Sequence, residues 1–379
     1  QQYSGPTVYV PDASRSVGTV QSLLNNKRKG EFIADVRKEY SRIRVSYEEK
    51  KVTRNLISLS EAREKKSHQN WKNYIPPEPE LKGIRIFENY SLDELTNYFD
   101  WTPFFTAWEL KGKYPKIFRN KKVGRQAKIL HDDALKLLKR IVSQNLLIAK
   151  GVIGFFPAVS IGDDIRIFRD EGRQQERMIL HHLRQQISKS HGQPNRCLAD
   201  YVAPEESGLK DWIGAFAVTV GHGVETLSKK FEKDEDDYNK ILLKILADRF
   251  AEAFTERIHE RVRQEFWGYA KDEVMDNESL IREKYRGIRP APGYPSCPDH
   301  TEKSNLWNLL KVEKHTGITL TENFAMIPAA SVSGWYFSHP DSAYFGLGPI
   351  SREQVTDYAR RKGMEVKAIE KWLAPHMGY

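Results

Sequence analysis

Residues 238–269 read YNKILLKILADRFAEAFTERIHERVRQEFWGY and form the longest periodic stretch of the chain. Large apolar residues recur at every third or fourth position, which predicts one long helix with an apolar face. At about 100° per residue, a second arc of this helix carries charged and large apolar residues together. A solvated face is the ordinary interpretation of a charged arc, but its apolar members favour a stripe that lines a cleft. The arc contains Ile241, Ile245, Asp248, Glu252, His259, Arg263 and Phe266.

The rest of the chain alternates between helical and strand patterns without a regular repeat. Apolar spacing and capping residues predict helices at residues 12–24, 31–49, 91–99, 123–144, 173–188, 305–312, 351–361 and 366–373. Short β-rich runs predict strands at residues 8–10, 151–158, 164–168, 197–203 and 212–220, and two more around a turn within 334–345. Residues 100–105 are expected to interrupt the helical pattern. This irregular alternation favours an α+β fold, with a mixed or antiparallel sheet flanked by helices.

A proline-rich connection at residues 71–82 divides the chain. Residues 1–75 are predicted to form a helical N-terminal extension, and residues 76–379 a single large body. The 379 residues are 39% hydrophobic, which is enough for a sizeable core. We find no run of eighteen apolar residues and no signal peptide, so no membrane association is expected. The two cysteines, Cys197 and Cys297, lie far apart, which favours a reducing compartment and a cytoplasmic location.

The net charge of +9 raises the question of which kind of partner, if any, the protein binds. Residues 37–66 carry ten Lys or Arg against five Asp or Glu on a predicted helix, and a solvated helix face explains most of that excess. Nucleic-acid binding would need a zinc-finger spacing, an aromatic RNA-binding strand or a basic tail, and we find none of these. An acidic protein partner explains the charge at least as well.

Residues 286–295 read RGIRPAPGYP, a stretch that no helix tolerates because its prolines fix φ and remove N–H groups. A stiff extended loop is the simple interpretation. The functional one is a clamp, in which the guanidinium of Arg289 grips a carboxylate, Gly293 allows close approach and Tyr294 offers a ring face.

Several catalytic signatures are absent from the sequence. We find no dinucleotide fingerprint, phosphate loop or nucleophile elbow, and Cys297 and His300 lack the second ligand pair of a zinc site. No catalytic residue and no metal ligand is therefore predicted. What remains is a recognition set suited to a zwitterionic amino acid with a cationic or aromatic body. It consists of Arg289, the acids Asp100, Asp248, Glu252 and Glu283, and the aromatic residues Tyr294, Tyr344 and Phe345.

At these residues the chain resembles the C-terminal activation module of cobalamin-dependent methionine synthase, which binds S-adenosylmethionine. The resemblance covers almost the whole chain. It is carried by VYVPDAS at 8–14, DWTPFF at 100–105, GKYP at 112–115, HLRQQ at 182–186, LADR at 246–249, HERV at 259–262, GIRPAPGYP at 287–295, HTEK at 300–303, SGWYFS at 333–338 and WLAP at 372–375.

The resemblance implies a set of ligand contacts. They fall on Asp100, Glu252, Glu283, Arg289, Ala291, Gly293, Tyr294, Tyr344 and Phe345. Asp248 resembles a residue that meets the displaced histidine of the cobalamin domain during reactivation.

The implied role is repair of the cofactor. In that family cob(I)alamin is occasionally oxidised to inactive cob(II)alamin, a flavodoxin-like or diflavin reductase supplies an electron, and S-adenosylmethionine supplies the methyl group that restores methylcobalamin. The cobalamin is held by a neighbouring domain, and both reactants bring their own reactivity, so the module only has to position them. This chain has no cobalamin, homocysteine or folate signature. It is expected to be part of a longer enzyme, or else a stand-alone relative with a regulatory or interaction role.

Overall fold

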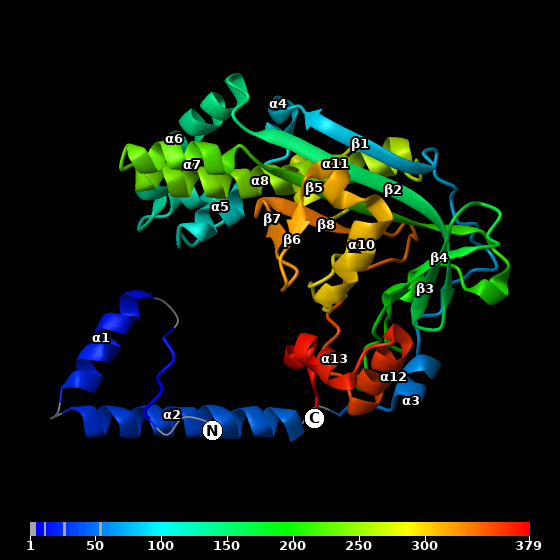
Figure 1. Ribbon diagram of the computed structural model, residues 1–379, viewed down its shortest axis with the longest axis horizontal. Coiled ribbons are helices and arrows are strands. Elements are labelled where there is room, and N and C mark those ends of the chain that lie inside the picture. The colour runs from blue at the N-terminus through cyan, green and yellow to red at the C-terminus, as the bar shows by residue number, and fades with distance from the viewer. Residues whose placement is uncertain (1–4, 11–12, 26–27, 53–54, 191) are drawn as a thin grey trace.

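An antiparallel sheet forms the centre of the protein (Figure 1). The structure is a computed structural model, which describes residues 5–10, 13–25, 28–52, 55–190 and 192–379. Six strands pair in the order β4-β3-β2-β5-β8, with β1 also beside β2, and every strand pair is antiparallel. The strands are β1 (Gly83–Tyr90), β2 (Ile148–Ile161), β3 (Asp164–Phe168), β4 (Glu176–His181), β5 (Asp211–His222) and β8 (Ser331–Tyr336), and β6 (Thr319–Leu320) pairs separately with β7 (Met326–Ile327).

The long strand β2 organises this sheet because it has three partners. Its first half pairs with β1, from Ala149 opposite Tyr90 to Phe155 opposite Gly83, and its second half pairs with β3. Its other edge pairs with β5. The predicted hairpin of residues 151–158 and 164–168 is therefore confirmed, and so is the buried strand predicted at residues 212–220.

Helices cover both faces of the sheet, so neighbouring strand residues enter different cores. Ile153 and Phe216 face α4 to α8, whereas Val152 and Ala217 face α10 and α11. Side chains alternate along a strand, which explains why β2 and β5 are apolar almost throughout. The helices of the two layers are α4 (Leu92–Thr96), α5 (Trp101–Ala107), α6 (Gly124–Ser143), α7 (Val224–Lys233), α8 (Asp237–Arg261), α9 (Asn277–Ile281), α10 (Lys303–Leu310) and α11 (Val312–Thr316).

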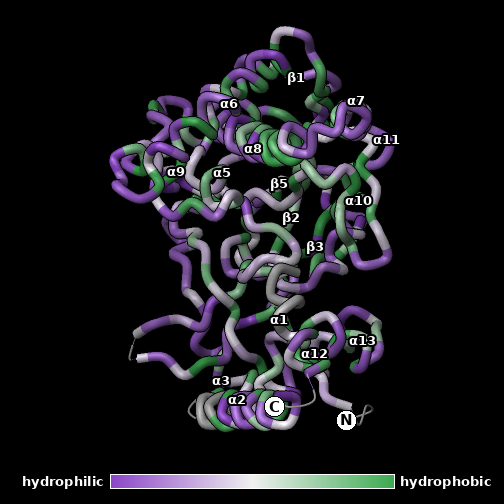
Figure 2. The backbone as a smooth tube through the Cα atoms, turned by 90° about the vertical axis from the view of Figure 1, so that its left-hand side faces the viewer, coloured by the Kyte–Doolittle hydropathy of each residue, from purple (hydrophilic) through white to green (hydrophobic). Residues whose placement is uncertain are grey.

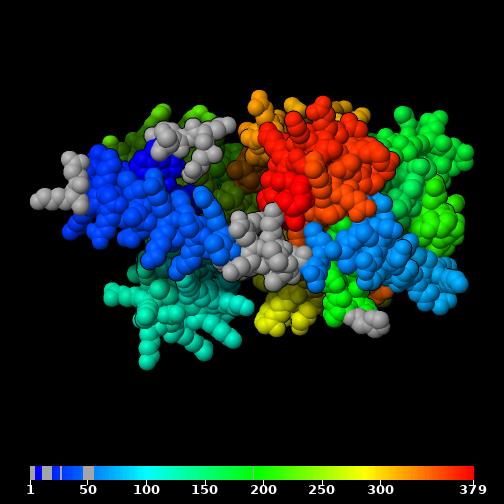
Figure 3. Space-filling view, turned by 90° about the horizontal axis from the view of Figure 1, so that it is seen from below, coloured from blue at the N-terminus to red at the C-terminus, as the bar shows by residue number. Residues whose placement is uncertain are grey.

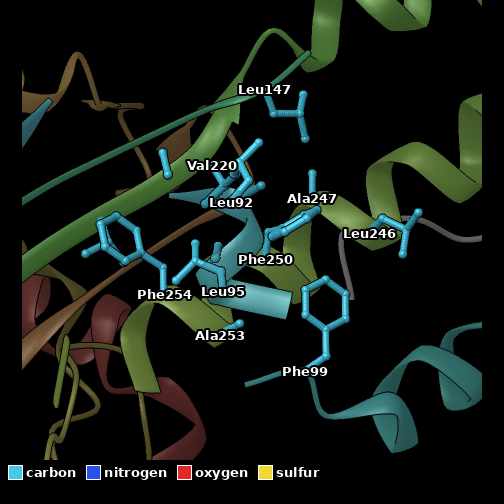
Figure 4. Close-up of a cluster of buried hydrophobic side chains, with 14 of the residues drawn as sticks. Leu92, Leu95, Phe99, Leu147, Val220, Leu246, Ala247, Phe250, Ala253 and Phe254 are labelled. Carbon is cyan, nitrogen blue, oxygen red and sulfur yellow. The ribbon is translucent and has the colours of Figure 1, made fainter. Parts of the chain in front are cut away.

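The long helix α8 is the main element of the larger core. In Figure 4, Leu92 and Leu95 of α4 lie against Phe250 and Phe254 of α8, and Leu147, the residue before β2, belongs to the same cluster. Figure 2 shows the hydrophobic stretches gathered where α8 meets the sheet. The periodicity of residues 238–269 thus predicted a helix correctly, and a π-helical turn, Val262–Phe266, follows it.

The C-terminal helices form a smaller core of their own. It contains α12 (Arg352–Lys362) and α13 (Val366–Trp372). Arg63 of α3 (Leu59–Glu64) donates to both Asp163 and Asp357, which joins this region to the sheet. Figure 3 shows α12 and α13 in orange and red beside the light-blue segment that contains α3. The helices predicted at residues 351–361 and 366–373 are confirmed.

The N-terminal helices cover neither face of the sheet in the described part of the chain (Figure 1). They are α1 (Ala13–Leu24) and α2 (Lys29–Val52), and Tyr9 N donates to the hydroxyl of Tyr40 on α2 at 2.7 Å. Both helices were predicted, although residue 12 of the expected cap lies outside the described residues. The division into residues 1–75 and 76–379 stays a prediction. Among the described helices, none combines the length and apolarity needed to cross a bilayer.

Several secondary-structure predictions are wrong because strand pairing, which the sequence does not show, decides these segments. Residues 173–188 do not form a helix, because Glu176–His181 pairs with β3 as an edge strand. Residues 8–10 form no strand, since no described strand lies beside them. β8 ends at Tyr336, and the expected second strand up to residue 345 is a loop. The strand β1 was not predicted at all.

Two further errors concern capped turns. The strand predicted at residues 197–203 is a 3₁₀ turn, Leu198–Tyr201, in which a carboxylate oxygen of Asp200 accepts from Cys197 N at 2.9 Å. The interruption predicted at residues 100–105 is instead the start of α5. Asp100 caps it by accepting from Thr102 N, and Pro103 lies in the first turn, where its missing N–H costs nothing.

Candidate functional site

A cavity of about 520 Å³ lies between α8, the proline-rich loop and the segment after β8. Residues of both the loop and β8 line it. Its lining residues are Phe216, Glu252, Thr255, Glu283, Arg289, Pro290, Ala291, Tyr294, Pro295, Ser296, Val332, Tyr344, Phe345 and Gly346.

Seven of the nine ligand residues expected from the sequence line this cavity, although they come from four separate segments. They are Glu252, Glu283, Arg289, Ala291, Tyr294, Tyr344 and Phe345. Gly293 belongs to the same loop, between Ala291 and Tyr294. Contact between these residues and a ligand stays a prediction.

Asp100 is the member that the structure places elsewhere. It lines a second, larger cavity of about 970 Å³, together with Trp101, Tyr114 and residues of α9. Arg282 lines this second cavity and Glu283 lines the first, so the two cavities meet the same short segment just after α9. Asp100 is also engaged as the cap of α5.

Hydrogen bonds to β8 and its following loop hold the proline-rich loop in place. Ile288 exchanges two backbone hydrogen bonds with Phe337, and Trp335 N donates to the carbonyl of Pro290 at 2.9 Å. Arg289 N donates to the hydroxyl of Tyr344 at 3.0 Å. These bonds replace the internal ones that the prolines forbid, and they confirm the extended loop predicted from the sequence.

Arg289 is held by three groups of the protein. Its Nη2 donates to Oε2 of Glu256 at 2.9 Å, and its Nη1 donates to the hydroxyl of Tyr285 at 2.7 Å and to Nδ1 of His259 at 3.2 Å. Among the described residues, these contacts leave Nε–H and the second Nη2–H for a ligand carboxylate. Burial alone lowers the pKa of Arg289, but Glu256, Tyr285 and Tyr344 together outweigh this effect, so this pKa lies well above its ordinary value.

His259 accepts from Arg289 because it is neutral. It is fully buried, and burial together with the charges of Arg263 and Arg289 lowers its pKa far below the ordinary value. A neutral imidazole can accept at Nδ1, whereas an imidazolium would repel the guanidinium. The ring stacks on Tyr336 with an interplanar angle of 12°, which fixes its orientation.

The residues of the charged arc of α8 become more buried towards the end of the helix. Asp248 is exposed, Glu252 lines the cavity one turn later, and His259 and Arg263 are fully buried. Arg263 forms an ion pair with Glu273 at 2.7 Å. The prediction that this arc lines a cleft is thus confirmed at Glu252. At the end of the arc, His259 is buried and contacts Arg289 of the cavity wall.

Two acidic side chains at the cavity have no ion-pair partner among the described residues, Glu252 and Glu283. Partial burial raises the pKa of Glu283, and the charge of Arg289 opposes this rise. Burial also raises the pKa of Tyr344, which keeps its hydroxyl protonated and able to accept from Arg289 N.

Glu256, Thr255 and Tyr285 were not predicted from the sequence. Glu256 lies four residues after Glu252, so a helical projection could have placed both on neighbouring turns of one face. Thr255 lines the cavity beside Glu252, but its hydroxyl donates to Ala251 O and gives no distinctive pattern. Tyr285 follows Glu283 in a turn, where no periodicity indicates the direction of a side chain.

A family model agrees with these observations. The model for the activation domain of vitamin B12-dependent methionine synthase matches residues 91–363. The chain belongs to this family. The matched residues include every lining residue of the cavity, as well as Asp100 and Gly293. Membership confirms the resemblance found in the sequence, and it implies a cobalamin-binding domain as the partner of this module.

A solved structure supports the same assignment. The chain is similar to a crystal structure of the MetH reactivation domain bound to AdoHcy, with 55% sequence identity and a TM-score of 0.83. The similarity covers 86% of this chain and 99% of that chain. The α+β fold predicted from the sequence is therefore confirmed.

Proposed function

We propose that this activation domain binds S-adenosylmethionine in the cavity beside Arg289 and presents its methyl group to the cobalamin of a neighbouring domain. The observation that carries this proposal is the arrangement around one cavity of one guanidinium, four aromatic rings and two carboxylates that have no ion-pair partner among the described residues. It is supported by the similar MetH reactivation domain, which was crystallised with AdoHcy. The module would thereby return an inactive cobalamin to its methylated form within methionine synthase.

The residues of the cavity match the parts of this ligand in kind. The free N–H groups of Arg289 suit the carboxylate of its methionine part. Glu252 and Glu283 suit the ammonium and sulfonium charges, and the rings of Tyr294 and Phe345 offer apolar contact to the adenosine. Asp100 would contribute only if the ligand, or α9, brings the second cavity into contact with the first.

Positioning is the chemical task of these side chains. The sulfonium group supplies an activated methyl, and the cobalamin supplies the centre that accepts it, so neither needs an acid or a base from this chain. Its prolines and its backbone hydrogen bonds to β8 and Phe337 restrict the loop, which lowers the entropic cost of aligning the methyl group.

Calorimetric titration of the chain with S-adenosylmethionine tests this proposal. We expect a saturable heat, and we expect Glu283→Ala to weaken it. Glu278→Ala is the matched control, because Glu278 lies on α9, is exposed and, among the described residues, forms an ion pair with Arg282 alone. Heat without saturation at millimolar ligand would contradict the proposal.

We further propose that an acidic, flavodoxin-like or diflavin reductase electron donor docks near the second cavity. Residues 111–125 carry seven Lys or Arg and no Asp or Glu. All seven are exposed, and none forms an ion pair with a described residue. Lys113, Lys116 and Arg119 line the second cavity, which Arg282 also lines, next in the chain to Glu283 of the proposed ligand site. A concentration of positive charge at this place suits an acidic surface that must approach the reaction.

We also propose a cytoplasmic location for the protein. Cys197 and Cys297 are both buried free thiols, and burial raises the pKa of each well above its ordinary value. Such thiols suit a reducing compartment.

A further inference from the structure

The ionisable groups at the cavity carry more negative than positive charge. Arg289 is the cation that lines it, and Glu256 already neutralises this cation. Glu252 and Glu283 line the cavity as well, and neither forms an ion pair with a described residue. The four groups together therefore have a formal charge of −2.

Glu256 is a fixed part of this arrangement. Its residue is 8% exposed, its Oε2 accepts from Arg289, and its Oε1 has no hydrogen-bond partner among the described residues. Its charge acts on two residues that line the cavity, Glu283 and Tyr344. Burial raises the pKa of Glu283 and of Tyr344, and Glu256 contributes to the rise in both.

We infer that Glu256 is a specificity-determining residue, which makes the cavity favour the sulfonium S-adenosylmethionine over the uncharged thioether S-adenosylhomocysteine. This inference rests on the proposed function. Without Glu256, Arg289 would still attract the carboxylate that both molecules share, but its uncompensated charge would repel the sulfonium. With Glu256 in place, the guanidinium can hold the carboxylate while the cavity as a whole attracts a cation.

The inference predicts that the product of methyl transfer leaves the cavity more readily than the substrate. Loss of the methyl group converts the sulfonium into a thioether, which removes one positive charge from the bound molecule. Adenosine, ammonium and carboxylate are unchanged by this step, so their contributions cancel when the two affinities are compared. The ratio of the two affinities therefore reports how strongly the site responds to the sulfonium charge.

The test is to measure the affinities of wild type and Glu256→Gln for both molecules by calorimetry. Glutamine keeps the size and the hydrogen-bond acceptor but removes the charge. We expect wild type to prefer S-adenosylmethionine, and we expect the variant to lose about fivefold of this preference, mostly through weaker binding of S-adenosylmethionine. Glu260→Gln is the matched control, because Glu260 lies one turn further along α8, is also 8% exposed, and pairs with Arg257 outside the cavity.

The outcomes separate the inference from the proposed function. An unchanged ratio in Glu256→Gln, or an equal loss of both affinities, overturns the inference, since a merely structural role would act on both molecules alike. Failure of wild type to bind either molecule overturns the proposed function instead. If Glu256→Gln does not fold, the double variant Glu256→Gln/Arg289→Gln replaces it, because it leaves no buried unpaired charge. The double variant is compared with Arg289→Gln, from which it differs only in the charge of Glu256, so we expect a weaker preference for S-adenosylmethionine in the double variant, and an equal preference in both proteins overturns the inference.

Discussion

Gly293 lies directly against the imidazole of His300. A Cβ atom at residue 293 would be 2.2 Å from Cε1 of His300, and the φ angle of Gly293 is +96°. Gly293 N also donates to the carbonyl of Cys297 at 2.7 Å, which closes the turn that presents Tyr294 to the cavity. Glycine is required here for two independent reasons, the left-handed backbone and the missing side chain.

Gly293→Ala is therefore expected to displace Tyr294 and to weaken binding of S-adenosylmethionine at least tenfold, since the strain and the clash together cost about 2 kcal/mol or more. Gly363→Ala is the control. Gly363 also has a positive φ, +65°, but nothing lies within 4 Å of its added Cβ. The control should lose stability, by about 1 kcal/mol, without losing affinity. Equal ligand affinity in Gly293→Ala and wild type would show that the turn is not part of the site.

Arg289→Ala is expected to affect both binding and folding. Loss of the carboxylate contact should weaken S-adenosylmethionine binding by about 2–3 kcal/mol. The free energy of unfolding should also fall, because Glu256 would stay buried without its partner. Calorimetry and urea denaturation measure the two effects. Arg282→Ala removes an exposed arginine paired with Glu278 and should change neither by more than about 0.5 kcal/mol. An Arg289→Ala protein that binds within twofold of wild type rules out the clamp.

Binding of an acidic electron donor should depend on salt and on the basic segment at residues 111–125. We expect the affinity to fall as NaCl rises from 100 to 400 mM, and we expect Lys113→Glu/Lys116→Glu to lower it by about 1–2 kcal/mol at low salt. Lys367→Glu/Lys371→Glu changes the net charge equally on α13, where both lysines are exposed, and should have a smaller effect. Equal losses in the two double variants would indicate that net charge alone, rather than this segment, attracts the donor.

His182 predicts a pH dependence of folding stability. It is 2% exposed, and burial lowers its pKa to about 3. Below pH 6.5 the unfolded chain binds a proton that the folded protein does not. Stability is therefore lost as the pH falls from about 6.5 towards 3, by about 1.4 kcal/mol per pH unit from this residue.

His182→Leu should remove that part of the pH dependence. Neither ring nitrogen of His182 has a hydrogen-bond partner among the described residues, so at pH 8 the variant should be within about 1.5 kcal/mol of wild type. Denaturant titrations at pH 8, 6 and 4.5 measure the difference. Parallel pH curves for the two proteins would mean that His182 is protonated in the folded state.

Helices with a strong local signal were predictable from the sequence. Residues 238–269 have an unbroken apolar period, and Ser91 is followed by Glu94, whose N–H donates to the Ser91 hydroxyl at 3.2 Å. The edge strand β4 was mistaken for a helix because its pairing with β3 supplies the order that its own residues do not indicate. β1 escaped prediction for the same reason, since its partner lies more than 50 residues later in the chain.

The apolar periodicity and the turn residues were enough to predict an α+β module built around one long helix, and the motifs were enough to predict the family. The sequence also indicated most of the cavity residues, because their chemical types and motif context are local properties. Which of these residues meet became visible in the folded protein alone. Folding brought Glu252, Arg289 and Tyr344 to one cavity, placed Asp100 beside another, and set Glu256 against Arg289. The physical reason is that side-chain neighbours across distant segments depend on how the sheet and α8 pack, and no local pattern of residues records that packing.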